Sequence, residues 1–583
     1  MLHITINGNP VQAREGATVL EASREDKYAS TQFDIDILSL NYLKGVQQED
    51  TSGLCVAEVA GKGIINASIT PVEDGMEITT NSPEIRERQK QALNQILAHH
   101  DLDCRNCHRT GNCELQEIQY VLRTTKKAAE KAYKKYSAEE DGIIIRDHNK
   151  CIRCGRCIAA CEQGQGIGAI KMDGEGFEGK VIASNGTLEE SGCVSCGQCI
   201  AVCPVGALRE RDDTDRIFEL IRDPEKYVVV QVAPSVRASI GEMFENYPIG
   251  SETKGKLAAA LRRLGFDRVF DTVLGADLTI MEEAHEFLQR LRSGENLPMY
   301  TSCCPGWISY CENVHGELLG QISSCKSPQQ MFGAMVKTYL AEKESIDKDR
   351  IVVVSVMPCT AKKKELARKD EAAAGVPDVD FSITNRELGR MIQQADISFM
   401  ELENEEFDSP LGIGSGAGTI FGVTGGVMEA ALRTANDWVN GTPQEKLDYQ
   451  EVRGVDGVKE AVYEIGDQRV RVAAVSGLHN LEELLKKMQA GEAAYDFVEV
   501  MACPGGCVNG GGQPQQTAEK RTIIDIRKKR AESLYRLDAQ SSIRRSYENS
   551  AIKEIYDTCL DEPGSDKAHR YLHTTYQAKG EQA

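Results

Sequence analysis

Two stretches of the chain, CIRCGRCIAAC (151–161) and CVSCGQCIAVCP (193–204), repeat one pattern of cysteines. In each stretch three cysteines are separated by two residues, and a fourth follows after three more residues. Soft thiolates on so tight a loop can bind one face of an inorganic cluster together. The repeat therefore predicts two metal clusters, in a domain that we place at residues 126–213.

The spacing of this repeat resembles that of bacterial ferredoxins with two four-iron clusters, in which the fourth cysteine of each stretch binds the other cluster. The resemblance implies one [4Fe-4S] cluster on Cys151, Cys154, Cys157 and Cys203, and a second on Cys193, Cys196, Cys199 and Cys161. Zinc sites are the alternative, but the duplication and the Pro204 after Cys203 argue against them. Glu162 after Cys161 departs from the ferredoxin pattern.

The composition of the whole chain is that of a large soluble protein. It has 583 residues, 41% hydrophobic and 27% charged, so we expect several globular domains. The formal net charge of -21 argues against nucleic acid or an anionic membrane as the main partner. The N-terminus lacks the pattern of a secretory signal, and no apolar run is long enough to cross a membrane, so we expect a cytoplasmic protein. In that setting 20 cysteines at short spacings favour metal ligands over disulfides.

Other domains are expected on both sides of the repeat. Residues 1–80 predict a small β-rich domain with strands at 3–7, 56–59 and 76–79, a hairpin turn at Asn7-Gly8 and a short helix at 17–23. Residues 81–125 begin with a helix at 84–99, and residues 126–140 predict a helix or a linker. Residues 517–583 are charged and helical, as in 518–536 and 550–560, and we expect them to wrap around the preceding domain.

The largest domain, at residues 214–516, shows the alternation of strands and helices that is typical of an open α/β sheet. The expected strands are 227–233, 267–271, 351–357, 470–475 and 496–501. Because ligands bind beyond the carboxyl ends of such strands, the cysteines that follow strands are candidate ligands. They are Cys303, Cys304, Cys359, Cys503 and Cys507. The alternative for each cysteine alone is a small buried apolar residue.

A further set of ligands has the spacing His100-x3-Cys104-x2-Cys107-x5-Cys113. Imidazole binds iron and zinc alike, so a His-ligated four-iron cluster and a structural zinc site are both compatible with this spacing. A chain that already carries four-iron motifs favours the cluster. His99 stands beside His100, which leaves the choice of histidine open.

Three longer segments closely resemble the signature motifs of the iron-only, or [FeFe], hydrogenases. They are TSCCPGW (301–307), MPCTAKKKE (357–365) and EVMACPGGCVNGGG (499–512). The segments APSVR (233–237), ADLTIMEEAHEF (276–287), SSCKSPQQMFG (323–333) and AGTIFGVTGGVMEAALRT (417–434) match this family too. The resemblance covers essentially the whole chain, and it implies that residues 214–516 form a two-lobed α/β domain followed by a C-terminal helical tail. It implies a catalytic subunit that interconverts molecular hydrogen with protons and electrons.

The resemblance also implies the cofactor, an H-cluster in which a four-iron cubane is joined to a two-iron unit with carbon monoxide, cyanide and a bridging azadithiolate. By position, Cys304, Cys359, Cys503 and Cys507 hold the cubane, Cys507 bridges to the two-iron unit, and Cys303 passes protons to the bridging amine. Glu283, Ser323, Glu286 and Arg290 match the proton route of the family. The residues that match those around the cyanide ligands are Ala233, Pro234, Ser235, Gln329 and Lys362, and those that match the apolar surround are Met357, Met501 and Phe421.

Some of these residues have ordinary alternatives. Glu283 and Glu286 can belong to a solvated helix face, and Lys362 can belong to a surface charge cluster with Lys363 and Lys364. Two other functions also compete with the hydrogenase. One is a hydrogen sensor or iron–sulfur assembly protein on the same scaffold, which would not need a proton relay. The other is a pure electron-transfer polyferredoxin, which leaves the cysteines at the strand ends unexplained.

The N-terminal domain departs from the family. Long family members carry a β-grasp domain whose four cysteines bind a plant-type [2Fe-2S] cluster, and those positions here are Asn41, Ser52, Cys55 and Ser68. One thiolate cannot hold a two-iron cluster, so we expect the β-grasp fold without it. We then expect electrons to pass through the His100 site or the cysteine repeat, to a ferredoxin or to partner iron–sulfur subunits. No nucleotide-binding motif is convincing, so any chemistry of formate, NAD or NADP belongs to a partner such as a formate dehydrogenase or an NAD(P)-linked flavoprotein.

Overall fold

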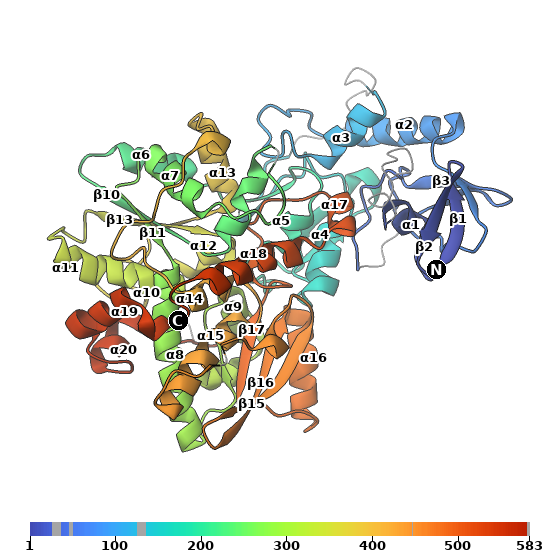
Figure 1. Ribbon diagram of the computed structural model, residues 1–583. Coiled ribbons are helices and arrows are strands. Elements are labelled where there is room, and N and C mark those ends of the chain that lie inside the picture. The colour runs from blue at the N-terminus through green and yellow to red at the C-terminus, as the bar shows by residue number, and fades with distance from the viewer. Residues whose placement is uncertain are drawn as a thin grey trace. The chain divides into compact units, whose positions relative to one another are not determined.

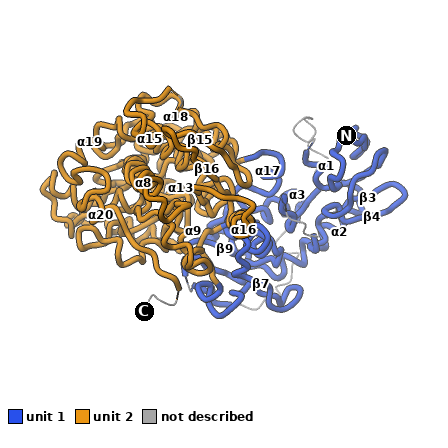
Figure 2. Tube along the Cα trace, turned by 90° about the horizontal axis from the view of Figure 1, so that it is seen from below, with its two compact units in different colours: residues 1–191, 198–210, 515–525 blue, residues 192–197, 211–514, 526–583 orange. Residues whose placement is uncertain are grey.

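The computed structural model describes residues 1–25, 37–45, 50–124, 136–140, 142–245, 247–445 and 447–579 (Figure 1). The chain divides into two compact units (Figure 2). Unit 1 comprises residues 1–191, 198–210 and 515–525, and unit 2 comprises residues 192–197, 211–514 and 526–583. The five domains expected from the sequence are a finer division, and their boundaries stay a prediction. Of the segment 126–140, residues 126–135 lie outside the described residues, and 136–140 contain no helix.

The N-terminal part of unit 1 is a mixed sheet with strand order β2-β1-β5-β3-β4. Its strands are β1 (Leu2–Ile6), β2 (Asn9–Ala13), β3 (Val56–Val59), β4 (Gly63–Asn66) and β5 (Glu77–Thr79), and helix α1 (Val19–Glu25) shares its core. The hairpin predicted at Asn7-Gly8 is confirmed, since both residues have positive φ, 53° and 77°. Two successive residues with positive φ match the twist of a two-residue hairpin turn, which favours Asn-Gly.

The rest of unit 1 consists of short helices and hairpins. Helix α2 (Pro83–Ala98) confirms the helix expected at 84–99, with the Ser82 side chain accepting a hydrogen bond from the Ile85 amide at its start. The other elements are α3 (Glu114–Val121), α4 (Arg156–Ala159), α5 (Gln198–Val202), α17 (Ala518–Ile523), β6 (Ile144–Arg146), β7 (Ile170–Asp173), β8 (Lys180–Ala183) and β9 (Leu208–Glu210). Strand β6 pairs with β9, which joins the two ends of the cysteine repeat, and β7 pairs with β8.

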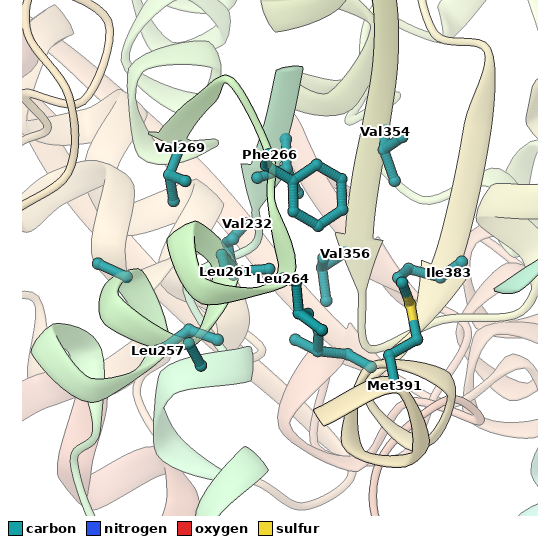
Figure 3. Packing of buried hydrophobic residues seen from close by; sticks show 14 of the residues in the cluster. Val232, Leu257, Leu261, Leu264, Phe266, Val269, Val354, Val356, Ile383 and Met391 are labelled. Atoms are coloured by element: carbon teal, nitrogen blue, oxygen red, sulfur yellow. The ribbon is translucent and has the colours of Figure 1, made fainter. Parts of the chain in front are cut away.

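The first sheet of unit 2 is parallel, with strand order β11-β10-β13-β14. The strands are β10 (Tyr227–Val232), β11 (Arg268–Asp271), β13 (Ile351–Met357) and β14 (Phe381–Thr384). Their valines are buried on both faces, as expected for a parallel sheet between helices. One face packs on α6 (Thr214–Arg222), α7 (Lys254–Leu264) and α13 (Asn385–Gln394), and Figure 3 shows Leu261 and Leu264 of α7 near Val232 and Val356. The other face packs on α8 (Val273–Ser293) and α10 (Pro328–Met335).

The second sheet of unit 2 has the strand order β12-β17-β16-β15. Its strands are β12 (Met299–Tyr300), β15 (Val458–Ile465), β16 (Gln468–Ser476) and β17 (Phe497–Met501), and only β15 runs antiparallel among these four. The helices α9 (Pro305–Val314), α15 (Gly426–Asn440) and α16 (Leu478–Gln489) lie close to it. All five strands expected in this domain are therefore present, but they are divided between two sheets.

The C-terminal segment supplies α18 (Ile526–Gln540), α19 (Ser550–Ile555) and α20 (Asp566–Leu572). The helix expected at 518–536 is interrupted, because Ile524 is extended and separates α17 from α18. In unit 2 the segment packs as expected, since Ile552, Ile555 and Leu560 join the core on the α8 side of the first sheet. In the described part of the chain, no helix is long and apolar enough to span a bilayer.

Candidate functional site

A cavity of about 750 Å³ in unit 2 is lined by residues that follow strands β10, β13 and β17. This is the edge of the sheets at which open α/β folds bind ligands. The three cysteine-bearing segments meet here, although Cys303 and Cys507 are 204 positions apart in the sequence (507 − 303). The lining includes Cys303, Cys304, Cys359, Cys503, Cys507, Ala233, Pro234, Ser235, Gln329, Met357, Lys362, Phe421 and Met501.

The five cysteines of this cavity are buried or half-buried thiols. Burial raises the pKa of Cys359 to about 11, and it raises the pKa of Cys303 well above its usual range. The amide of Ala502 donates a hydrogen bond to Cys304 Sγ at 3.5 Å. A metal centre would stabilise the deprotonated form of such thiols, and four soft donors around one space suit an iron–sulfur cluster. The donor set therefore fits the implied group.

Polar groups at the rim of the cavity fit the same group. Ser235 Oγ is buried and, among the residues described, has no hydrogen-bond partner. Lys362 Nζ donates to the carbonyl of Cys303 at 3.2 Å and to Glu365 at 2.9 Å. Gln329 Nε2 also donates to Glu365, at 2.8 Å. A positive charge and a free hydroxyl beside the thiols are suited to small anionic ligands.

The structure separates the three consecutive lysines. Lys362 lies on α12 (Ala361–Glu365), is only 8% exposed and lines the cavity. Lys363 is also buried, but it bonds to Glu387 at 2.8 Å and Asp213 at 2.7 Å. A surface charge cluster is therefore the wrong description of these two lysines.

Glu283 of α8 is fully buried close to the cavity. Its Oε1 accepts a hydrogen bond from the Ser302 amide at 3.3 Å, while Oε2 has no partner among the described residues. Burial raises the pKa of this carboxyl to about 8, with the nearby Glu286 and Glu499 adding to the rise. Glu283 is therefore no part of a solvated helix face, and at neutral pH it holds a proton that it can exchange.

Glu286 and Arg290 continue the same face of α8 toward its C-terminal end. Ser323 Oγ donates to Glu286 at 2.7 Å, and Arg290 donates to Glu286 at 2.5 Å. Arg290 also donates to the carbonyls of Gln321 and Ile322 at 2.8 and 3.0 Å. Glu283, Glu286 and Arg290 are three and then four residues apart, and this spacing places their side chains on one side of the helix.

Cys151, Cys154, Cys157 and Cys203 line a second cavity, of about 420 Å³, in unit 1. The two halves of the repeat have matching backbones, since Arg153 and Ser195 both have positive φ, 58° and 55°. In each half the amide of that residue donates to the sulfur of the first cysteine at 3.4 Å. Of the second predicted ligand set, Cys161 and Cys199 belong to unit 1, and Cys193 and Cys196 belong to unit 2, so this set stays a prediction.

A third cavity, of about 370 Å³, is lined by His100, Cys104, Cys107 and Cys113. Burial lowers the pKa of His100 to about 4, and its Nδ1 has no hydrogen-bond partner among the residues described. A neutral imidazole with a free nitrogen is a ready metal ligand. The neighbouring His99 instead stacks on Phe177 and bonds to the carbonyl of Gln95. The structure therefore selects His100 as the candidate ligand.

Comparisons with known proteins agree with this geometry. Residues 226–511 match the model of the iron only hydrogenase large subunit, C-terminal domain, and residues 524–579 match that of the iron hydrogenase small subunit. The chain is 43% identical to iron hydrogenase 1 of Clostridium pasteurianum, in an alignment that covers 99% of this chain and 100% of that protein. It is also 43% identical to the NADP-reducing hydrogenase subunit HndD of Solidesulfovibrio fructosivorans, in an alignment that covers 99% of each chain.

The chain belongs to the iron-only hydrogenase family. Among solved structures, the apo [FeFe]-hydrogenase HydA1 of Chlamydomonas reinhardtii is 46% identical, with a TM-score of 0.56 over 63% of this chain and 99% of that one. Three more family models match the N-terminal third of this hydrogenase. They are a 2Fe-2S iron-sulfur cluster binding domain at 1–83, an NADH-ubiquinone oxidoreductase-G iron-sulfur binding region at 89–127 and a 4Fe-4S dicluster domain at 150–207.

The first of these domains does not fit a two-iron cluster in this hydrogenase. The Ser68 hydroxyl donates to Asn66 at 2.7 Å and accepts the Asp50 amide at 3.0 Å. The Asn41 and Ser52 side chains are bonded as well, to Thr51 and to Asp50 respectively. Cys55 is 1% exposed, and burial raises its pKa. The positions that would bind iron thus carry a closed set of oxygen and amide groups.

Asp50 is the centre of this set. Its Oδ2 accepts hydrogen bonds from the Ser39 hydroxyl and from the amides of Leu40 and Asn41, at 3.2 to 3.3 Å. Its Oδ1 accepts the amide of Ser52 at 2.8 Å. Through these hydrogen bonds Asp50 joins residues 39–41 to Ser52.

Two buried carboxylates of this hydrogenase escaped the sequence analysis. Glu365 pairs with Lys362 and Gln329, and its position three residues after Lys362 on a helix was the available signal. Glu499 accepts the amides of Gly425 and Met428 at 2.6 and 2.7 Å, at the start of α15, and burial raises its pKa to about 7. No local sequence pattern indicates that Glu499 is functional, since it lies within a strand whose residues are all buried.

Proposed function

We propose that this iron-only hydrogenase oxidises and forms molecular hydrogen at an H-cluster held in the 750 Å³ cavity. The proposal rests on one observation, which is that five cysteines from three remote segments line the same space. Cys304, Cys359, Cys503 and Cys507 would hold the four-iron cubane, and Cys507 would also bridge to the two-iron unit. When bound, the H-cluster supplies an iron site for hydrogen and a bridging amine for proton exchange.

The other lining residues would position the two-iron unit. Lys362 offers a buried ammonium group, and Ser235 offers a hydroxyl with no other partner in the described structure. Gln329 lines the same cavity, as do Ala233 and Pro234. Cyanide is a small anion that such donors recognise. Met357, Met501 and Phe421 add apolar surface that would exclude water.

Protons would travel along α8. The thiol of Cys303, which lines the cavity, would hold the proton first, and Glu283 would accept it next, since burial keeps the pKa of Glu283 close to the working pH. The hydrogen-bonded group of Ser323, Glu286 and Arg290 then leads toward the half-buried end of the helix. This order reverses when hydrogen is formed.

Electrons would travel through three accessory [4Fe-4S] clusters. We infer one on His100, Cys104, Cys107 and Cys113, and two on the cysteine repeat, with no [2Fe-2S] cluster at Asn41, Ser52, Cys55 and Ser68. The partner would be a ferredoxin or iron–sulfur subunits of a cytoplasmic complex. An NADP-reducing relative that is described as a subunit supports a complex, with an NAD(P)-linked flavoprotein or a formate dehydrogenase as its other catalytic component.

Infrared spectroscopy and hydrogen evolution test the proposal together. The matured chain should show bands of metal-bound carbonyl and cyanide, bind about 18 iron atoms and evolve hydrogen from reduced viologen. Replacement of Cys359 by serine should abolish the infrared bands and the activity. The matched control is Cys559→Ser, since Cys559 lines none of the three cavities. A matured chain with all its iron but without those bands would refute the H-cluster. A content of about 20 iron atoms would instead indicate that the N-terminal domain binds a [2Fe-2S] cluster.

A further inference from the structure

A second hydrogen-bonded group, which does not include Arg290, lies beside Glu286. The Ser324 amide donates to Glu286 at 3.2 Å, and the Ser324 hydroxyl bonds to Nδ1 of His573 at 2.8 Å. Ser324 therefore contacts Glu286 through its backbone and His573 through its side chain. Arg290 reaches Glu286 from the same helix, four residues further on.

His573 is in turn paired with a buried carboxylate. Its Nε2 lies 3.0 Å from Oε2 of Glu282, and the side chain of Glu282 is completely buried. Tyr556 donates to the other oxygen of Glu282 at 2.5 Å, and the amide of Gly564 donates to Oε2 at 2.9 Å. A histidine between a hydroxyl and a carboxylate is held with Nδ1 toward the hydroxyl, because the carboxylate binds the other ring nitrogen.

This pair has access to solvent through a second histidine. The ring of His569 lies on that of His573, with 4.1 Å between the ring centroids and a tilt of 40°. His569 is exposed, whereas His573 is mostly covered. Burial, His573 and His285 lower the pKa of His569, while Glu282 and Glu286 act against this. All five of these titratable groups lie on α8 or on the C-terminal segment that covers it.

We propose that Ser324, His573 and His569 form a second proton outlet from Glu286, parallel to the outlet through Arg290. This inference rests on the proposed function, in which Glu286 carries protons. The Ser324 hydroxyl keeps its 2.8 Å bond to Nδ1 of His573, takes the proton of Glu286 on its oxygen and gives its own hydrogen to Nδ1. Water at the His573–His569 pair then takes one proton from the imidazolium of His573. The net result is the transfer of one proton from Glu286 to solvent, without any transfer of electrons. Glu282 is a positioning residue in this scheme.

Parallel outlets predict additive rates. Ser324→Ala keeps the amide that bonds to Glu286 but removes the hydroxyl, so hydrogen evolution limited by proton supply should fall by about twofold if the outlets are equal. The double variant Ser324→Ala/Arg290→Ala should lose far more than either single variant and approach the rate of Glu286→Gln. Thr558→Ala is the matched control, because it removes an exposed hydroxyl of the same C-terminal segment that bonds only to the carbonyl of Glu554 among the described residues.

Chemical rescue separates proton transfer from structural support. His573→Ala should regain activity with added imidazoles, and the extent of rescue should follow the pKa of the imidazole, which a mere filler of space would not produce. Infrared difference spectra give a readout apart from activity, since the protonated-carboxyl band of Glu286 should shift in Ser324→Ala. His573→Gln serves as a second variant if Ser324→Ala lowers the content of iron.

The outcomes distinguish this inference from the proposed function. A wild-type chain with a complete H-cluster that evolves no hydrogen would refute the proposed function. If the wild type is active, the second outlet alone can be overturned. This happens if Ser324→Ala and His573→Gln keep the full rate and the double variant is no slower than Arg290→Ala.

Discussion

Glu283→Gln is the most direct perturbation of the proton route. The substitution keeps the size of the side chain and leaves an amide oxygen for the Ser302 amide, which now bonds to Glu283 at 3.3 Å. It removes the group with a pKa of about 8, which can both hold and release a proton near neutral pH. Because a positioned acid or base contributes about 10² to 10⁴ in rate, we expect hydrogen evolution to fall by this factor.

The pH dependence carries the sharper part of this prediction. In the wild type the protonated fraction of Glu283 falls about tenfold per unit above pH 8, so hydrogen evolution should decline there, while hydrogen oxidation, which needs the carboxylate, should rise toward pH 8. In Glu283→Gln, neither the decline of hydrogen evolution above pH 8 nor the rise of hydrogen oxidation toward pH 8 should remain. The folded chain also binds this proton more tightly than the unfolded chain, so the contribution of Glu283 to the free energy of unfolding should fall by about 1.4 kcal/mol per unit as pH rises from about 4.5 to about 8. The variant should lack that slope.

The assay compares the matured variant with Glu295→Gln, a control in which the carboxylate is exposed just beyond the end of α8. Both variants should keep the infrared bands of the cofactor and the same content of iron. Hydrogen evolution from reduced viologen and hydrogen oxidation are then measured from pH 6 to about pH 9, a range that brackets the raised pKa. If Glu283→Gln keeps at least half of the wild-type rate with an unchanged pH profile, Glu283 is not the relay.

Substitutions at three other sites give the remaining predictions. Asp50→Ala should destabilise the N-terminal domain by about 3 kcal/mol, because it leaves several buried amides and hydroxyls without an acceptor; limited proteolysis should detect this, and an unchanged cleavage rate would contradict it. His100→Ala should remove about four iron atoms and spare hydrogen evolution from viologen, whereas His99→Ala should remove none; equal loss in both variants would refute the choice of His100. Lys362→Met should cost about 3 to 5 kcal/mol of unfolding free energy, since it leaves Glu365 buried and unpaired, and it should move the cyanide infrared bands; unmoved bands would exclude contact with the cofactor.

Features set by neighbouring residues were largely predictable. The Asn7-Gly8 turn and the helix after Ser82 depend on local backbone preferences, and the structure confirms both. The break at Ile524 was missed, because no proline or glycine marks it. The five strands of the α/β domain were also found, and the family resemblance implied two lobes. Which strands belong to which sheet was not predicted, since pairing depends on residues far apart in the chain.

By itself the sequence determined the ligand spacing of the cysteine repeat, the strands with cysteines at their ends and the missing thiols of the N-terminal domain, because each is a matter of residue type and short-range order. Only the tertiary structure decided which of two histidines is buried beside Cys104, that Lys362 bonds to Glu365 while Lys363 bonds to Glu387, and that Asp50 bonds to Ser39 and Asn41. These outcomes depend on burial and on partners from distant segments. Desolvation by such partners also raises the pKa of Glu283, and no stretch of sequence contains that information.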